Sequence, residues 1–274
     1  MSYQTIVVHV DASRHAPARI RIAAELARAH QAHLIGLAAT GVSREVFPHG
    51  YRAAPGSLEA SYFGPLHDKA ARALEQFSAI AGADGLACET RLACDLASDA
   101  LARLGRFSDL VVVNQDDLNE ALSETVGRIP EYVAFTCARP VLVVPCAPVV
   151  GEVGRHILIA WNGSKEASAA LPLLQRAVRV RVVSFRAADD ADLADPLQQA
   201  DLTAFLARHG VRADIFAFDR TIDDGRALLA FAAQESDDLI VMGCYGHSQF
   251  RELVLGGASS TVLRSAMVPV LMAR

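Results

Sequence analysis

The chain has 274 residues, a formal net charge of −5 at pH 7 and a hydrophobic content of 52%. This length suits one large or two ordinary domains, and the scattered Lys and Arg residues argue against a nucleic-acid surface. The longest apolar stretch, 140–150, is too short to span a bilayer, and no basic, apolar leader opens the sequence. The cysteines form no C-x-x-C pair, which favours reduced thiols. We therefore expect a cytoplasmic protein with neither nucleic acid nor membrane as a partner. The cysteines are Cys88, Cys94, Cys137, Cys146 and Cys244.

Short apolar segments alternate with amphipathic segments along the whole chain. The first half predicts strands at 4–10, 33–39, 86–92, 109–114 and 140–144, and helices at 15–31, 58–82, 95–106 and 127–137. The second half predicts strands at 155–161, 179–185, 213–218, 238–243 and 269–273, and helices at 164–177, 191–209, 223–235 and 257–266. This alternation predicts an α/β fold of two tandem doubly wound (Rossmann-like) domains, each with a five-stranded parallel sheet and helices on both faces.

An internal repeat supports the two-domain prediction. The segment around Asp11 matches the segment around Asn162 at an offset of 151 residues, whereas Asn114 matches Gly243 at an offset of 129. The first copy is therefore longer by about 22 residues, which we place within 41–65 because loops tolerate such growth. The repeat predicts domains at 1–147 and 152–274. We expect their last strands to pair about a pseudo-two-fold axis, which would cover two edge strands.

The second copy carries a glycine-bearing loop after its fourth strand, from Gly243 through Gly246 to Gly256. A loop between the carboxyl end of a parallel strand and a helix start directs free backbone N–H groups at one spot, which suits a phosphate. Glycines that only shape a turn are an equal alternative on these residues alone. Asn162 ends the first strand of this copy, and it meets Gly243 at a crevice if the two strands are neighbours.

The spacing Gly243-x2-Gly246-x9-Gly256 resembles the nucleotide-binding loop of the universal stress protein family, G-x2-G-x9-G followed by Ser or Thr. Residues 157–164 are similar to the family's first strand and D-G-S turn, and 268–272 to its last strand. Asn162 and Gly257 depart from the family pattern, which has Asp and Ser or Thr at these places. The resemblance implies a tandem universal stress protein whose C-terminal domain binds ATP or a related nucleotide, with or without Mg²⁺. The implied nucleotide-binding residues are Ala160, Asn162, Gly243, Gly246, His247, Gly256, Gly257, Ala258 and Ser259.

Each of these polar residues also has an ordinary structural role. Asn162 could cap the following helix, and Ser259 could be an N-cap. His247 could be a solvated loop residue, and Arg251 could either donate to a phosphate or be solvated. Cys244 could be an accessible, reactive thiol, although no basic cluster is evident near it in the sequence.

The first copy departs from the loop pattern. Its equivalent loop starts at Asn114, and Asp117 stands in place of the second glycine, next to Asp116. Two adjacent carboxylates repel a phosphate, so this domain is predicted to keep the fold with a degenerate nucleotide loop. Asp11 would be a remnant of the site or a helix cap. Asp109 and the pair at 237–238 are interpreted as residues at strand starts, not as catalytic groups.

The sequence favours binding over turnover, because it shows no nucleophile motif, evident general base or metal-ligand spacing. We expect no catalytic residues, no resident metal site and at most slow ATP hydrolysis. A nucleotide that orders 244–255 would change what an unidentified protein partner contacts, and a homodimer of the whole chain is expected as well. One alternative is a stress-response interaction module that binds no nucleotide, which Gly257 favours. Another is a weak ATP-using hydrolase of the adenine-nucleotide α-hydrolase-like group.

Overall fold

The computed structural model describes residues 3–47, 51, 56–117, 128–171, 176–186, 196–244 and 257–274. The chain divides into two compact units, an N-terminal unit that ends at Val141 and a C-terminal unit that begins at Leu142. The domain limits that the repeat predicts, 1–147 and 152–274, remain a prediction, which this division into units does not test. Within the ranges that the structure describes, no helix combines the length and the apolar character needed to cross a membrane.

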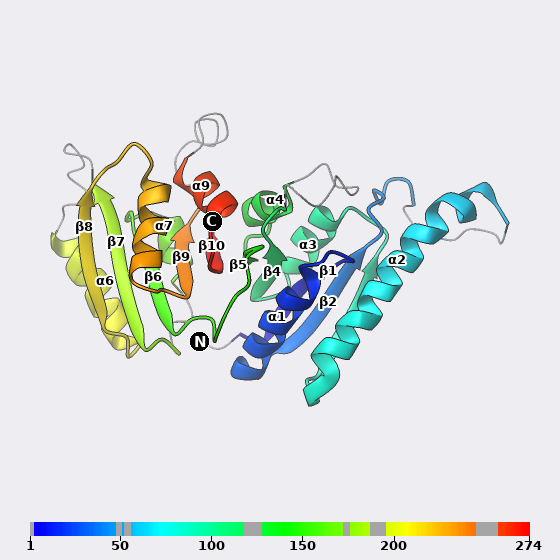
Figure 1. The fold of residues 1–274 in the computed structure, drawn as a ribbon, viewed down its shortest axis with the longest axis horizontal. Coiled ribbons are helices and arrows are strands. Elements are labelled where there is room, and N and C mark those ends of the chain that lie inside the picture. Colours follow the sequence, from blue (N-terminus) through cyan, green and yellow to red (C-terminus); the bar gives the residue numbers. More distant parts are fainter. Residues whose placement is uncertain are drawn as a thin grey trace. The chain divides into compact units, whose positions relative to one another are not determined.

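The N-terminal unit is a parallel sheet between two layers of helices (Figure 1). Its strands lie in the order β3-β2-β1-β4, and α1 packs with α2 whereas α3 packs with α4. A further strand, β5 (Val141–Val144), begins at the last residue of the unit, and the preceding Pro140 carbonyl accepts a hydrogen bond from the Val111 amide of β4. The other elements are β1 (Thr5–Val10), α1 (Ala16–His30), β2 (His33–Ala39), α2 (Leu58–Ala81), η1 (Gly82–Asp84), β3 (Cys88–Ala93), α3 (Ala97–Gly105), β4 (Leu110–Asn114) and α4 (Ile129–Thr136).

The C-terminal unit has a parallel sheet in the order β10-β9-β6-β7-β8, with α6 and α7 on opposite faces (Figure 1). The strands at the centre of this order, like those of the first unit, are continuous apolar runs, because helices cover both of their faces. Its elements are β6 (His156–Ala160), α5 (Lys165–Ala169), β7 (Arg179–Arg186), α6 (Pro196–Arg208), β8 (Ala213–Asp219), α7 (Asp224–Gln234), β9 (Leu239–Gly243), α9 (Ala258–Ser265) and β10 (Val270–Ala273).

The α/β fold predicted from the sequence is confirmed, and each predicted strand begins and ends within two residues of an observed one. The predicted helix at 164–177 is wrong in its length, because α5 ends at Ala169 and Leu171 is no longer helical. The physical reason is the proline at 172. A proline disfavours the helical conformation at the residue before it and cannot donate the helical hydrogen bond itself.

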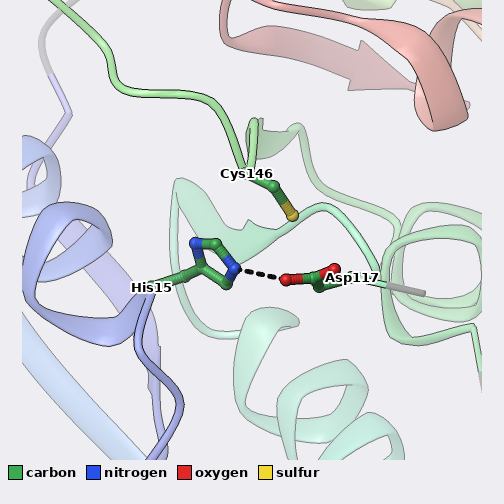
Figure 2. Close-up of side chains that lie close together, drawn as sticks. All are labelled: His15, Asp117 and Cys146. Atoms are coloured by element: carbon green, nitrogen blue, oxygen red, sulfur yellow. Dashed lines mark hydrogen bonds and ion pairs between the residues drawn. The ribbon is translucent and has the colours of Figure 1, made fainter. Parts of the chain in front are cut away.

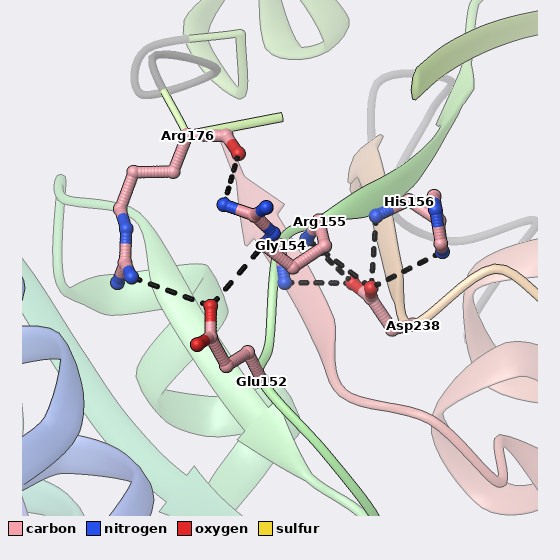
Figure 3. Close-up of polar contacts among 6 residues, drawn as sticks. All are labelled: Glu152, Gly154, Arg155, His156, Arg176 and Asp238. Atoms are coloured by element: carbon pink, nitrogen blue, oxygen red, sulfur yellow. Dashed lines mark hydrogen bonds and ion pairs between the residues drawn. The ribbon is translucent and has the colours of Figure 1, made fainter. Parts of the chain in front are cut away.

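Aspartates at the start of β4 and β9 hold the start of the neighbouring strand in each unit. Asp238 accepts hydrogen bonds from three consecutive backbone amides, those of Gly154, Arg155 and His156, at 2.7, 3.0 and 2.8 Å (Figure 3). Asp109 likewise accepts from the amides of residues 4 and 5 at 2.8 and 2.9 Å. These contacts give both aspartates the strand-start role that the sequence predicts, because they satisfy amides at the first residue of each neighbouring strand and just before it.

Candidate functional site

The carboxyl ends of β6 and β9 lie side by side at the edge of the sheet where the sequence predicts a ligand-binding crevice. The two strands are parallel neighbours, with Ala160 opposite Met242, so that Gly243 lies one residue beyond this pair. Asn162 and Gly243 therefore follow or end neighbouring strands, as the prediction from the sequence required for the two residues to meet. In parallel sheets such an edge carries the ligand-binding loops, because each strand there leads into a crossover connection.

Asn162 lies two residues beyond β6 and forms an Asx turn. Its Oδ1 accepts hydrogen bonds from the amide and the hydroxyl of Ser164, at 3.2 and 2.7 Å. Ser164 is the N-cap of α5, and its Oγ accepts from the Ala167 amide at 3.2 Å. The helix-start role considered for Asn162 is thus present, although Ser164 is the cap itself. Within the described ranges the Asn162 Nδ2 makes no hydrogen bond, and the side chain is exposed, so this donor can serve a ligand.

Gly243, the last residue of β9, is in close contact with the first turn of α5. A Cβ atom at this position would lie 2.4 Å from the Ala167 amide nitrogen and 2.7 Å from the carbonyl carbon of Glu166. Both are backbone atoms, which cannot rotate away. The need for glycine here therefore comes from helix–strand packing.

The third part of the predicted site is the start of α9. Gly257 is the N-cap residue, so the N-cap role considered for Ser259 is wrong; Ser259 lies in the first turn and is 4% exposed. The amides of Ser260 and Thr261 donate to the Gly257 carbonyl. In the described part of the chain the amides of Ala258 and Ser259 have no acceptor, which is the arrangement that binds anions at a helix start.

Several candidates lie outside the described residues, namely Gly246, His247, Arg251 and Gly256. Cys244 is described, and it is buried at 1% exposure. The accessible thiol considered for Cys244 is therefore wrong. Its amide continues the ladder by donating to the Ala273 carbonyl of β10, at 2.9 Å.

Sequence reasoning missed two acidic residues near this crevice. Glu166 is buried in the first turn of α5, against Gly243, with Lys165 at 3.6 Å. Asp223 is the N-cap of α7, and its Oδ2 accepts a hydrogen bond from the Thr261 hydroxyl of α9 at 3.4 Å. The Asp223-Asp224-Gly225 stretch is a sequence signal for a helix start, but its contact with α9 depends on the tertiary fold.

The equivalent crevice of the N-terminal unit is filled by Arg19, which is 1% exposed. Its Nε donates to the His9 carbonyl at 2.7 Å, near the end of β1. Its Nη1 donates to Asn114 Oδ1 and its Nη2 to Asp11 Oδ1, both at 2.9 Å. Asp11 also accepts from the amide and the hydroxyl of Ser13. The sequence offered no signal for this network, because a single arginine in an amphipathic helix is usually solvated.

Asp117, the residue in place of the second glycine, is held by basic side chains of the same unit. His15 Nε2 lies 2.8 Å from its Oδ2 (Figure 2), and Arg14 forms an ion pair with the same carboxylate. The third residue drawn, Cys146, belongs to the C-terminal unit. The pairing leaves Asp117 less repulsive to an anion than the sequence suggested, so Arg19 is the stronger physical reason to expect no nucleotide in this unit.

Burial and the neighbouring charges shift the protonation of His9 and Asp11. Burial lowers the pKa of His9 from 6.5 to about 4; Asp11 opposes the shift and Arg19 adds to it. Burial works against ionisation of Asp11, but Arg19, His9 and Ser13 outweigh it and hold the pKa of this carboxyl well below its usual range. Asp11 is therefore a carboxylate and His9 is neutral at pH 7.

We expect His9 to make the N-terminal unit less stable as the pH falls from about 6.5 to about 4. In this window the unfolded chain protonates His9 while the folded chain does not, so a fall in pH favours unfolding by up to about 3 kcal/mol. The measurement is the free energy of unfolding against pH for the wild type and His9→Gln. The difference between the two isolates His9. The same difference also removes the contribution of Asp116, which is common to both proteins. Burial and the nearby Glu131 raise the pKa of Asp116 to about 6, so this carboxyl makes the folded unit more stable as the pH falls. Parallel pH profiles would contradict the prediction.

Comparison with known proteins agrees with this architecture. Residues 154–274 match the model of the Universal stress protein family. A universal stress protein from Archaeoglobus fulgidus DSM 4304 is 15% identical, with 98% of this chain and 96% of that chain covered and a TM-score of 0.74. A putative one from Pseudomonas aeruginosa UCBPP-PA14 is 14% identical, with 99% and 93% covered and a TM-score of 0.60. Universal stress protein Slr1230 of Synechocystis sp. is 40% identical over 45 residues, which are 16% of this chain and 16% of that protein. Residues 154–274 are therefore a universal stress protein domain, in a chain that has the universal stress protein fold over its whole length.

Proposed function

We propose that the C-terminal unit binds ATP or a related nucleotide, with or without Mg²⁺, as a regulatory ligand in stress response. The observation that carries the proposal is the crevice at the carboxyl ends of the neighbouring strands β6 and β9. Ala160 and Gly243 end these strands, and Asn162 follows with an amide nitrogen that no described group accepts. Such an edge, with a helix start beside it, is where α/β sheets bind nucleotides.

The phosphates would lie at the start of α9. This helix connects β9 to β10, which are parallel, so α9 begins at the same edge of the sheet as the crevice. Its first amides, those of Ala258 and Ser259, are free of acceptors within the described ranges and would donate to phosphate oxygens. Gly246, His247 and Gly256 belong to this proposal through the loop spacing, although the structure does not describe them.

The ligand would act by its binding, without being turned over. The described carboxylates nearest to the crevice are a buried Glu166 and a helix-capping Asp223, which is engaged with the Arg226 amide and Thr261. Among the described residues, Glu166 contacts Lys165 and Asp223 contacts the Thr261 hydroxyl, and neither contact forms a nucleophile, base and orienting group arranged as a catalytic set. A bound nucleotide would change the surface offered to a protein partner, and hydrolysis would be slow at most.

The test begins with the small molecules that the purified protein carries. We expect mass spectrometry after denaturation to detect ATP or ADP, and calorimetric titration with ATP and Mg²⁺ to give one site per chain, because Arg19 fills the other crevice. Gly246→Asp, which copies Asp117 of the first unit, should abolish binding by charge repulsion. Asn162→Ala should weaken it by about 5-fold, the value of one hydrogen bond.

A matched control separates the site from a general effect of added charge. Gly82→Asp makes the same substitution at a glycine with an ordinary backbone conformation and nothing within 4 Å of its Cβ position. It should bind nucleotide as the wild type does. The absence of nucleotide from the purified protein, together with no binding at millimolar ATP, would reject the proposal. The protein would then be an interaction module without a nucleotide.

A further inference from the structure

The residues that hold Arg19 are the repeat counterparts of the residues proposed to hold the nucleotide. The offset of 151 residues that pairs Asp11 with Asn162 also pairs His9 with Ala160. The offset of 129 residues pairs Asn114 with Gly243. His9, Asp11 and Asn114 each supply one acceptor to the Arg19 guanidinium, at 2.7, 2.9 and 2.9 Å. The guanidinium therefore occupies the part of the N-terminal crevice where the other unit offers its ligand-binding groups.

The two units differ at the position of the arginine itself. The offset of 151 residues places Ala170 at the equivalent position of the C-terminal unit, where the side chain is a buried methyl group. Asn114 provides a side-chain amide where the C-terminal unit has Gly243. The N-terminal unit therefore has both the arginine and the Asn114 acceptor, whereas the C-terminal unit has neither at the equivalent positions. A buried arginine is retained only where its donors are satisfied, and here all three of its nitrogens have acceptors.

We infer that Arg19 is a built-in ligand of the N-terminal crevice, and that this crevice is a binding site for a planar guanidinium-class cation which the chain supplies from its own α1. Three acceptors arranged around one guanidinium plane match the fixed fork of donors in arginine. A single carboxylate, Asp11, balances the charge. The inference concerns the N-terminal unit and does not depend on nucleotide binding in the C-terminal unit.

Chemical rescue of a truncated arginine tests the inference. Arg19→Ala removes the guanidinium and leaves its three acceptors around a cavity, and we expect the Tm of the full chain to fall by about 10 °C. Methylguanidinium at millimolar concentration should then raise the Tm of Arg19→Ala by about 3 °C in a saturable way. It should not raise the Tm of the wild type, in which the site is filled. Calorimetric unfolding in the absence of nucleotide gives these values.

The controls distinguish a guanidinium site from a general salt effect. Methylammonium chloride at the same concentration carries the charge without the planar fork and should not rescue Arg19→Ala. Equal shifts of the wild type and Arg19→Ala by methylguanidinium, or equal rescue by methylammonium, would overturn the inference. If Arg19→Ala does not fold, Arg19→Lys decides: it keeps a cation but cannot bridge the three acceptors, and we expect its Tm to lie about 5 °C below the wild type. A Tm of Arg19→Lys equal to the wild type would also overturn the inference.

Discussion

Gly243→Ala is expected to destabilise the C-terminal unit by about 3 kcal/mol and to remove nucleotide binding with it. The added methyl group would lie 2.4 Å from the Ala167 amide nitrogen and 2.7 Å from the Glu166 carbonyl carbon, so α5 must move as a unit. Its displacement would also move the Asx turn of Asn162, which is joined to the helix through Ser164. Overpacking against backbone costs more than overpacking against a side chain, because no rotamer change relieves it.

The measurement is the free energy of unfolding from urea titration, followed by the fluorescence of Trp161. This is the only tryptophan in the sequence and lies directly after β6, so it reports on the C-terminal unit. Gly82→Ala is the control, because a Cβ there meets nothing within 4 Å, and its effect should stay within about 0.5 kcal/mol. Because Gly82 lies in the N-terminal unit, far-UV circular dichroism follows the unfolding of this variant and of the wild type. A similar value for Gly243→Ala would show that α5 yields easily and that the glycine serves another purpose.

Gly243 also shows how far sequence reasoning reaches. The spacing of the loop glycines identified the family resemblance, and the apolar run before Gly243 predicted its strand within one residue. The reason for the glycine could not be predicted, because it depends on the distance between β9 and a helix that begins some 80 residues earlier in the chain. The end of that helix was predictable, since the proline at 172 breaks the pattern.

The contacts of Arg19 could not be predicted from the sequence. The sequence set the N-terminal loop apart through Asp116 and Asp117, and it assigned the predicted loss of the site to their charge. The three acceptors of Arg19 lie up to 95 residues away in the chain. A sequence pattern gives which face of a helix is apolar, but it does not give where a long polar side chain on that face finds its partners.

Arg181→Met is expected to destabilise the C-terminal unit by about 4 kcal/mol. Arg181, on β7, is 3% exposed, and its Nη1 lies 2.5 Å from Asp237 Oδ1, with Glu235 at 2.8 Å from Nη2. The Asp237 side chain is fully buried, and its Oδ2 has no partner among the described residues. Removal of the arginine therefore leaves a buried carboxylate without compensation, and this costs more than the loss of the pair itself.

The double variant Arg181→Met/Asp237→Leu separates these two costs. It removes both charges and should recover most of the lost free energy, because apolar groups often replace a buried ion pair at little cost. Arg220→Met is the matched control: its partner Asp224 lies 3.1 Å away, but Arg220 is 55% exposed, so the change should stay within about 1 kcal/mol. Urea titrations with Trp161 fluorescence give all three values. Equal effects of Arg181→Met and Arg220→Met would contradict the prediction.

The pH dependence of the stability of Arg181→Met gives a second test of the buried Asp237 carboxylate. Burial raises the pKa of Asp237 in the wild type, although the nearby Arg181 lowers it. Without the arginine the pKa rises further, so the folded variant keeps a proton that the unfolded chain has released. Its stability is therefore highest in acid and is lost as the pH rises through the folded pKa. The deficit relative to the wild type should be smaller at pH 4.5 than at pH 8, whereas a deficit caused only by lost packing would not change with pH.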